Sequence, residues 1–304
     1  MKRIICLALF LLIFLTGCQG EKTQPQTPIK VQQKIEAETY LRIETTNKLL
    51  YYMVRDIVKD HHDVEYMMVD ENDQWKFEYT EDSLNNIAGK DLFIYFGGGF
   101  EPWVDDFVDK LKKGGLSIVD CSRGIKSLGL EVPRKYGDTE IKDNPYYWMD
   151  SNYYEIALSN IKNAIEEKDP KNRSYYEDNF QQVVKKLDDL NKKFSGDTEK
   201  YKKYTFITLD DSLDYFFKFR NIQTLNIESM DISEVLSELD KRKSDSGQFV
   251  LAYDVEASLT GYESLIGTYN MKTIKIEKYN PNKDYTTLLN DNYISLSLLP
   301  SPAT

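Results

Sequence analysis

The sequence predicts an α/β protein with two lobes, each built from a mostly parallel sheet flanked by helices, with a long helical segment between them. Three observations support this prediction. Short apolar runs alternate with helical patterns over residues 41–120, helical spacing dominates residues 152–200, and the alternation resumes at residue 204. Alternating strands and helices are typical of parallel sheets, because two parallel strands need a crossover connection, which is usually a helix.

The first lobe is predicted over residues 39–150. Its expected strands are 41–46, 64–69, 92–96 and 117–120, and its expected helices are 49–58, 82–87 and 103–111. Gly97-Gly98-Gly99 follows a strand, but the dinucleotide fingerprint and the P-loop lysine are missing. A plain strand-to-helix turn is therefore favoured over a phosphate site. Cys121 ends a strand-like run and is predicted to be a small buried residue.

The helical segment is predicted over residues 151–200, and the second lobe over residues 201–304. Asp169-Pro170 breaks the segment with N-cap chemistry, and a long helix over 175–194 follows it with one apolar face. The second lobe is expected to contain strands 204–208, 224–227, 249–253 and 273–276, and helices 211–219, 232–242, 257–269 and 286–298.

The first residues predict export and lipidation. Two basic residues precede an apolar run over 4–15, which is too short to span a bilayer as a permanent helix. The run ends in Leu15-Thr16-Gly17-Cys18, which resembles the bacterial lipobox. We expect residues 1–17 to be a signal peptide, Cys18 to carry the lipid, and residues 18–38 to be a flexible tether. The expected location is the extracytoplasmic face of the cell membrane, where acyl chains hold the protein.

Composition excludes some classes of function. The formal net charge is −11, and it becomes two units more negative when the signal peptide leaves with Lys2 and Arg3. Nucleic-acid binding needs a basic surface, so no nucleic-acid partner is expected. The hydrophobic fraction of 41% is enough for a substantial core. With Cys18 acylated and Cys6 removed, Cys121 has no partner for an intrachain disulfide.

Five segments, in chain order, resemble the zinc/manganese solute-binding lipoproteins of bacterial ABC importers. They are Ala88–Trp103, with its Glu-Pro-Trp ending, Ile118–Ile125, Asn144–Asp150, Asp169–Asn179 and Asp284–Asn292. The resemblance covers residues 40–300. It implies two lobes bridged by one long rigid helix, with a solute cleft between them. It also implies that an ABC permease and an ATPase are the partners of this chain, which is expected to be a monomer.

The same resemblance locates four cleft positions at which the family binds a metal ion with histidines and carboxylates. In this sequence they fall on Trp75, Tyr146, Asp210 and Glu277. Trp cannot ligate a metal ion through its N–H, and Tyr ligates only as a phenolate. Asp210 and Glu277 therefore remain as the predicted metal ligands. Two carboxylates favour a hard, manganese-like cation over zinc. A cleft that binds no cation is the alternative.

Other candidate features have simpler interpretations. His61 and His62, the only histidines, are expected in a solvated turn away from the cleft. Asp210-Asp211 is interpreted as an N-cap pair rather than as catalytic carboxylates. Trp148 and the tyrosines beside it are expected in the core or at the lobe interface, although an aromatic pocket for an organic solute remains an alternative.

The sequence favours one of three candidate functions. The favoured hypothesis is an extracytoplasmic solute-binding lipoprotein of a metal-type ABC importer, which captures a divalent cation or a small solute between its lobes. The alternative is a diverged homologue that binds no metal and acts on another solute or as a surface interaction protein. A surface enzyme is not expected, because no nucleophile–base pair or metal-hydrolase spacing is present.

Overall fold

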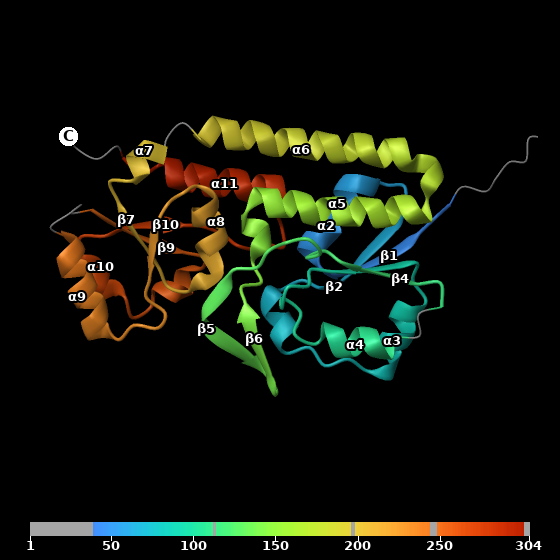
Figure 1. The fold of residues 1–304 in the computed structure, drawn as a ribbon, viewed down its shortest axis with the longest axis horizontal. Helices are drawn as coiled ribbons and strands as arrows, with labels where there is room; N and C mark the ends of the chain where they lie inside the picture. Colours follow the sequence, from blue (N-terminus) through green and yellow to red (C-terminus); the bar gives the residue numbers. More distant parts are fainter. Residues whose placement is uncertain (1–38, 112–113, 196–197, 244–247, 301–304) are drawn as a thin grey trace, which may run out of the picture. The chain divides into compact units, whose positions relative to one another are not determined.

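Two parallel four-stranded sheets form the framework of the protein, and this confirms the predicted fold class (Figure 1). The computed structural model describes residues 39–111, 114–195, 198–243 and 248–300. The expected signal peptide, Cys18 and the tether lie outside these residues. The chain from Thr39 onward forms one compact unit. Over the described ranges, no helix has both the length and the apolar character needed to cross a membrane.

The first sheet has the strand order β2-β1-β3-β4, and all its pairings are parallel. Its central residues are inaccessible, as parallel sheets covered on both faces require; Ile43, Leu92 and Ile94 are examples. Cys121 is buried as predicted. The elements of this lobe are β1 Arg42–Asn47, α2 Lys48–Val58, β2 Asp63–Met68, η2 Glu71–Trp75, α3 Glu81–Ala88, β3 Leu92–Tyr95, α4 Val104–Lys110 and β4 Ser117–Asp120.

A β-hairpin follows the first sheet, and the sequence analysis did not predict it. Strands β5 Gly129–Tyr136 and β6 Thr139–Asp143 pair antiparallel around a turn in which Gly137 has a φ of 55°. Most side chains of both strands are exposed. The apolar and polar alternation that reveals a half-buried strand is therefore weak here.

The helical segment contains η3 Tyr147–Met149, α5 Ser151–Lys168, η4 Pro170–Asn172, α6 Arg173–Ser195 and α7 Thr198–Tyr201. Helix α6 packs on helices of both lobes, as its long course in Figure 1 shows. The Asn179 amide donates to the carbonyl of Ile57 in α2 at 2.8 Å. Nearer its other end, Asn191 accepts a 2.6 Å hydrogen bond from the Tyr293 hydroxyl. One helix thus contacts both lobes, as the family resemblance implies.

The second sheet has the strand order β10-β9-β7-β8 and is also fully parallel. Its central strand residues Phe206, Val250 and Leu251 are inaccessible. The elements are β7 Thr205–Thr208, η5 Asp211–Leu213, α8 Asp214–Phe219, β8 Thr224–Asn226, α9 Ile232–Lys243, β9 Phe249–Tyr253, η6 Glu256–Leu259, α10 Glu263–Thr268, β10 Lys272–Lys275 and α11 Tyr285–Ser297.

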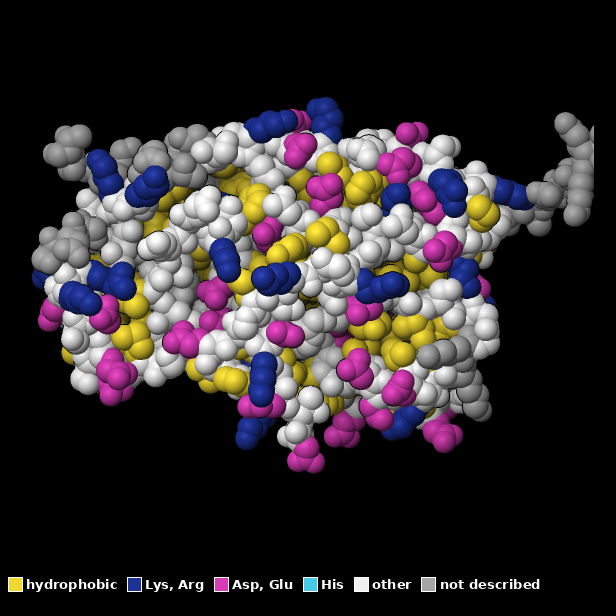
Figure 2. Space-filling view, in the orientation of Figure 1, with side chains coloured by type: hydrophobic (Ala, Val, Ile, Leu, Met, Phe, Trp, Pro, Cys, Tyr) yellow, Lys and Arg dark blue, Asp and Glu magenta, His cyan; other side chains and the backbone are white. Residues whose placement is uncertain are grey.

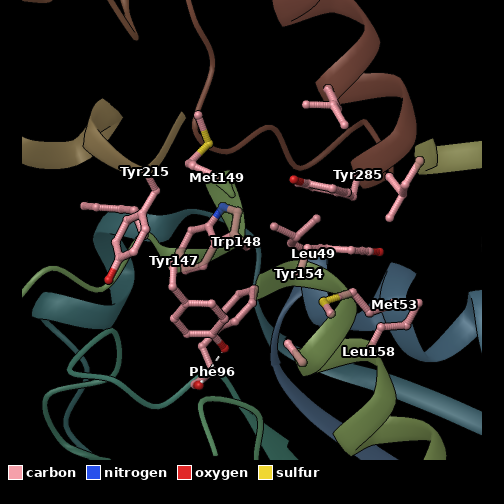
Figure 3. Close-up of a cluster of buried hydrophobic side chains, with 14 of the residues drawn as sticks. Leu49, Met53, Phe96, Tyr147, Trp148, Met149, Tyr154, Leu158, Tyr215 and Tyr285 are labelled. Atoms are coloured by element: carbon pink, nitrogen blue, oxygen red, sulfur yellow. Dashed lines mark hydrogen bonds between the residues drawn. The ribbon is translucent and has the colours of Figure 1, made fainter. Parts of the chain in front are cut away.

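One apolar core continues from the first lobe into the second (Figure 3). The rings of Tyr154 in α5 and Tyr285 in α11 stack with their centroids 3.7 Å apart. Trp148 is fully buried and stacks on Phe96 at 4.2 Å, so its interpretation as a core residue is confirmed. Packed aromatic pairs add roughly 1 kcal/mol each beyond their buried area. The two lobes are therefore joined by close packing as well as by α6.

His62 lies in the interior, so the interpretation of its turn as solvated is wrong for this residue. The Leu41 N–H approaches its Nδ1 at 3.4 Å, and the Tyr176 hydroxyl lies 2.7 Å from its Nε2. That hydroxyl donates to Asp169 at 2.6 Å. Burial lowers the pKa of His62, which favours the neutral imidazole. Its role is therefore to join the edge of the first sheet to α6.

Candidate functional site

The candidate site lies where the carboxyl ends of strands from both sheets face each other. In open parallel sheets, ligands bind beyond these ends, because the polar loops that follow the strands converge there. Here η2 follows β2 in the first lobe. Asp210, Asp254 and Lys278 follow β7, β9 and β10 in the second. The side chains on these connections include the ion pairs of Lys278 with Glu71 and Asp254.

A network of buried polar groups fixes the first-lobe side of the site. The carboxylate of Glu101 accepts hydrogen bonds from the Thr46 hydroxyl at 2.5 Å and from the backbone N–H groups of Phe96 and Gly97 at 2.9 and 3.0 Å. Gln74 accepts a hydrogen bond from the Trp103 indole at 3.1 Å. The Gln74 amide also donates to the carbonyl of Thr46 at 3.4 Å, so η2, which contains both Glu71 and Trp75, is held against the end of β1.

Four residues, Glu71, Arg134, Asp254 and Lys278, form a charged cluster at the site, and Lys278 lies at its centre. Its Nζ lies 3.1 Å from Oε1 of Glu71 in the first lobe and 3.0 Å from Oδ2 of Asp254 in the second. It also lies 5.1 Å from the ring centroid of Tyr146. The Lys278 and Glu71 side chains are each 14% exposed. One ammonium group therefore bridges two largely buried carboxylates from different lobes.

The electrostatic environment keeps this lysine charged. Burial alone lowers the pKa of Lys278, but the neighbouring carboxylates, Glu71 and Asp254 among them, outweigh burial and raise that pKa above its ordinary value. Burial raises the pKa of Glu71, and the Oε2 atom of that carboxylate has no hydrogen-bond partner among the residues that the structure describes. The carboxylate of Glu71 thus depends on the ammonium for compensation of its charge.

Arg134 provides a second cation beside the first. Its guanidinium carbon lies 5.5 Å from the ring centroid of Tyr146 and 6.0 Å from that of Trp75. Its Nη1 donates to the Tyr146 hydroxyl at 3.2 Å. Burial raises the pKa of Tyr146, so the hydroxyl remains a neutral phenol near pH 7. Tyr146 therefore offers no phenolate for metal binding in this arrangement.

Asp210 lies at the same junction. Its backbone is extended, and its carboxylate accepts a 2.7 Å hydrogen bond from the N–H of Ser212, which agrees with the predicted N-cap role. Its charge contributes to the raised pKa values of both Arg134 and Lys278. Three of the four expected cleft positions, Trp75, Tyr146 and Asp210, are thus grouped around two cationic side chains.

Glu277 has different neighbours. Its carboxylate pairs with Lys275 at 2.8 Å and with Lys283 at 2.6 Å, and its backbone N–H donates to the Asn292 side chain in α11. Successive side chains of an extended segment point to opposite sides. A shift of one residue therefore exchanges Glu277 for Lys278 at the position facing Tyr146.

Sequence reasoning missed four residues of the charged cluster: Glu71, Arg134, Asp254 and Lys278. Asp254 had a usable signal, because it directly follows an apolar strand, as Asp210 does. Lys278 lies one residue beyond the position chosen from the resemblance. Arg134 lies in the exposed hairpin, where no pattern marked it. Within the described ranges, no three or more His, Cys, Asp or Glu side chains form a group that could hold a metal ion.

Comparison with known proteins gives matches along most of the chain. The family described as "Zinc-uptake complex component A periplasmic" matches residues 43–293. The chain is 25% identical to the high-affinity zinc uptake system protein ZnuA of Bacillus subtilis, over 83% of this chain and 75% of that protein. It is 27% identical to a metal ABC transporter substrate-binding lipoprotein of Lactococcus lactis, over 76% of this chain and 72% of that protein.

Solved structures share the fold. The metal-dependent lipoprotein YcdH of Bacillus subtilis aligns with a TM-score of 0.70 and 22% identity, over 84% of this chain and 97% of that chain. A ZnuA variant that lacks residues 138–173 of its own sequence, crystallised with zinc, aligns with a TM-score of 0.71 and 18% identity, over 88% of this chain and all of that chain. These likenesses establish the two-lobed architecture.

Proposed function

Because the chain belongs to the family of periplasmic zinc-uptake complex component A, we propose that it is the extracytoplasmic solute-binding lipoprotein of a metal-type ABC importer. In this role it captures a small solute between its lobes and delivers it to a membrane permease. The relatives named as ABC transporter substrate-binding lipoproteins support this assignment. The proposed activity is binding and delivery rather than catalysis.

The observation that carries the proposal is the grouping of Trp75, Tyr146 and Asp210 at the carboxyl ends of strands from both lobes. A solute bound there touches both lobes at once. Its binding energy can therefore add to the contacts that already hold the lobes together, since a ligand shifts an equilibrium by its differential affinity for the two states. A permease that recognises both lobes together can then distinguish the loaded protein.

The metals named for the relatives do not fit the residues present here. One curated relative, scaA of Streptococcus gordonii, is a manganese ABC transporter substrate-binding lipoprotein, and ZnuA of Bacillus subtilis is a zinc uptake protein. In this chain Trp75 has no metal-ligating atom, Tyr146 is a neutral phenol, and Lys278 brings a positive charge. Asp210 remains the proposed contact for cargo. We therefore assign the cargo to small solutes held by oxygen atoms and aromatic rings, and not to zinc held by imidazoles.

The proposed partners and location follow from the family. An ABC permease and an ATPase receive the cargo, and a lipid on Cys18 holds the monomeric protein at the outer face of the membrane. Nucleic acid is not a proposed partner. Figure 2 shows acidic side chains along the edge that carries α3 and α4, and both helices have acidic first turns, with Glu81, Asp82, Asp105 and Asp106. Such an edge repels phosphate backbones.

Metabolic labelling with palmitate tests the anchor, and crosslinking in intact cells tests the partners. The wild type and Cys121→Ala should incorporate label and sediment with membranes, whereas Cys18→Ala should do neither. Crosslinking of the membrane-bound protein should recover an ABC permease subunit. Failure to capture any ABC permease subunit, with the protein present at normal abundance, contradicts the assignment.

A panel of divalent cations and small organic solutes identifies the cargo by thermal shift. Asp210→Ala should abolish the shift produced by the cargo. Asp231→Ala is a matched control, because Asp231 caps α9 on the exposed surface of the second lobe.

A further inference from the structure

We propose that the ammonium group of Lys278 is a built-in cation that takes the place of a cargo metal ion, so that the two lobes close without metal. The inference rests on the proposed function only in placing the cargo cleft at this junction. It concerns what holds the lobes together there.

The ammonium is held by carboxylate oxygens, the kind of ligand that a hard cation also takes. Two carboxylate oxygens lie at 3.0 and 3.1 Å, from Asp254 and Glu71, and the face of the Tyr146 ring lies at 5.1 Å. Carboxylates and aromatic faces are the groups that stabilise a desolvated cation. The two carboxylates that a divalent ion would use at this point are already engaged by a covalently attached charge.

The cluster crosses the lobe interface. Glu71 belongs to η2 of the first lobe, whereas Asp254 and Lys278 follow strands of the second. The backbone of Lys278 is held as well: its N–H donates to Oδ1 of Asp254 at 3.0 Å, and its carbonyl accepts from the Trp148 indole at 2.9 Å. The ammonium is thus presented from a fixed backbone, which reduces the entropy lost when the ion pairs form.

The residues after Lys278 continue the contact between lobes. The Tyr279 hydroxyl donates to the carbonyl of Val69 at 2.7 Å, and the Tyr52 hydroxyl donates to the carbonyl of Pro281 at 3.1 Å. Segment 278–281 therefore lies across the first lobe as a strap. The Lys278–Glu71 ion pair is the charged contact of this strap with the first lobe.

An incoming divalent ion would have to displace the ammonium from two largely buried carboxylates. The displaced lysine would then remain near the ion, and the repulsion between the two cations would oppose metal binding. Arg134, beside Tyr146 and Trp75, adds a further positive charge. Closure of the cleft in this chain is consequently expected to be independent of metal.

Hydrogen exchange and thermal unfolding of the mature protein test the proposal. Wild type, treated with EDTA and then with Mn²⁺ or Zn²⁺, should show unchanged exchange in segments 69–75 and 278–281 and no metal-dependent rise in Tm. Lys278→Met should increase exchange in both segments by roughly a hundredfold, because it leaves two buried carboxylates without compensation. Lys278→Arg, which retains the charge, should restore most of the protection.

Two further variants sharpen the test. Lys283→Met removes a lysine that pairs with Glu277. Hydrogen exchange of this variant in both segments should be the same as in wild type. Lys278→Asp places a third carboxylate at the site, and Mn²⁺ should raise its Tm and restore protection. Protection of wild type that is lost in EDTA and regained with metal overturns the proposal. Unchanged exchange in a folded Lys278→Met protein also overturns it. Neither result affects permease crosslinking, which tests the proposed function separately.

Discussion

Glu101 makes the stability of the first lobe sensitive to pH. Its carboxylate is fully buried behind the glycine turn and accepts hydrogen bonds from Thr46, Phe96 and Gly97. Burial raises the pKa of Glu101 from 4.5 to about 7, although these hydrogen bonds oppose the rise. The informative substitution is Glu101→Gln, which keeps the size and one acceptor oxygen but cannot ionise.

The sign and size of the effect follow from linkage. The folded pKa is raised, so the folded protein binds more protons than the unfolded chain between pH 4.5 and about 7. The contribution of Glu101 to the free energy of unfolding is therefore fully present at low pH and is lost as the pH rises through 7. At 1.36 kcal/mol per pKa unit, the loss is roughly 3 kcal/mol, most of it between pH 5 and 8.

Glutamine has its own constant cost. One end of its amide is a donor, and it would face a donor of the Glu101 pocket, where a carboxylate now accepts from both Phe96 and Gly97. A lost buried hydrogen bond costs about 1–3 kcal/mol. Glu101→Gln is thus expected to be less stable than wild type at pH 5 and to approach or exceed it at pH 8.

Urea unfolding at pH 5, 6, 7 and 8 measures both quantities. The difference between the two free energies of unfolding should change by roughly 2.5 kcal/mol across this range in favour of the variant. Burial, together with the neighbouring Asp211 and Asp210, also raises the pKa of Asp214 to about 7. The stability of Asp214→Asn relative to wild type should therefore also change with pH, and it serves as a comparison. If the stability of Glu101→Gln runs parallel to that of wild type at all four pH values, the burial argument for Glu101 fails.

Two further predictions concern the turn and the lobe contact. Gly97→Ala should lower the free energy of unfolding by about 1–3 kcal/mol, because Gly97 has a φ of +70° and a Cβ there would lie 2.1 Å from Oδ1 of Asp120. Gly115→Ala, with open space around it, should be nearly neutral in the same urea titration. Asp211→Ala should lower Tm, since its carboxylate accepts from the Glu131 N–H in the hairpin and from the Asn226 amide, each at 2.6 Å. Calorimetry measures the Tm of Asp211→Ala and of the exposed control Asp189→Ala, which should lie within about 0.5 kcal/mol of wild type in stability. Equal Tm values for the two variants would contradict the prediction.

The order of strands and helices could be predicted because both sheets are parallel and buried. Their strands are short apolar runs, and most of them are followed by a helix with an apolar face. The hairpin over residues 129–143 escaped prediction for the opposite physical reason. It is antiparallel and largely exposed, so neither periodicity nor a continuous apolar run marks it. With the hairpin, Arg134 was missed as well.

The candidate site was harder to predict than the fold, because its identity depends on single residues at strand ends. A shift of one position along the segment after β10 separates Glu277, which pairs with lysines beside α11, from Lys278, which faces Tyr146. A local sequence pattern fixes such a register poorly, whereas the alternation of side chains makes the shift decisive. His62 shows the same limit, since only the tertiary structure provides Tyr176 as its partner.

The scaffold and the cleft of this chain are determined by different groups of residues. Glu101, Gly97 and Trp148, which lie in the segments that resemble the family, build the turn, the polar network and the aromatic core that hold the two lobes. None of them requires a particular cargo. The cleft, in contrast, depends on a few side chains at strand ends, where we propose that Trp75 and Tyr146 stand at positions of the family's metal ligands and where Lys278 bridges the lobes. A lysine at that place satisfies the carboxylates without a metal ion, so the same framework can retain its closed form while its cargo changes.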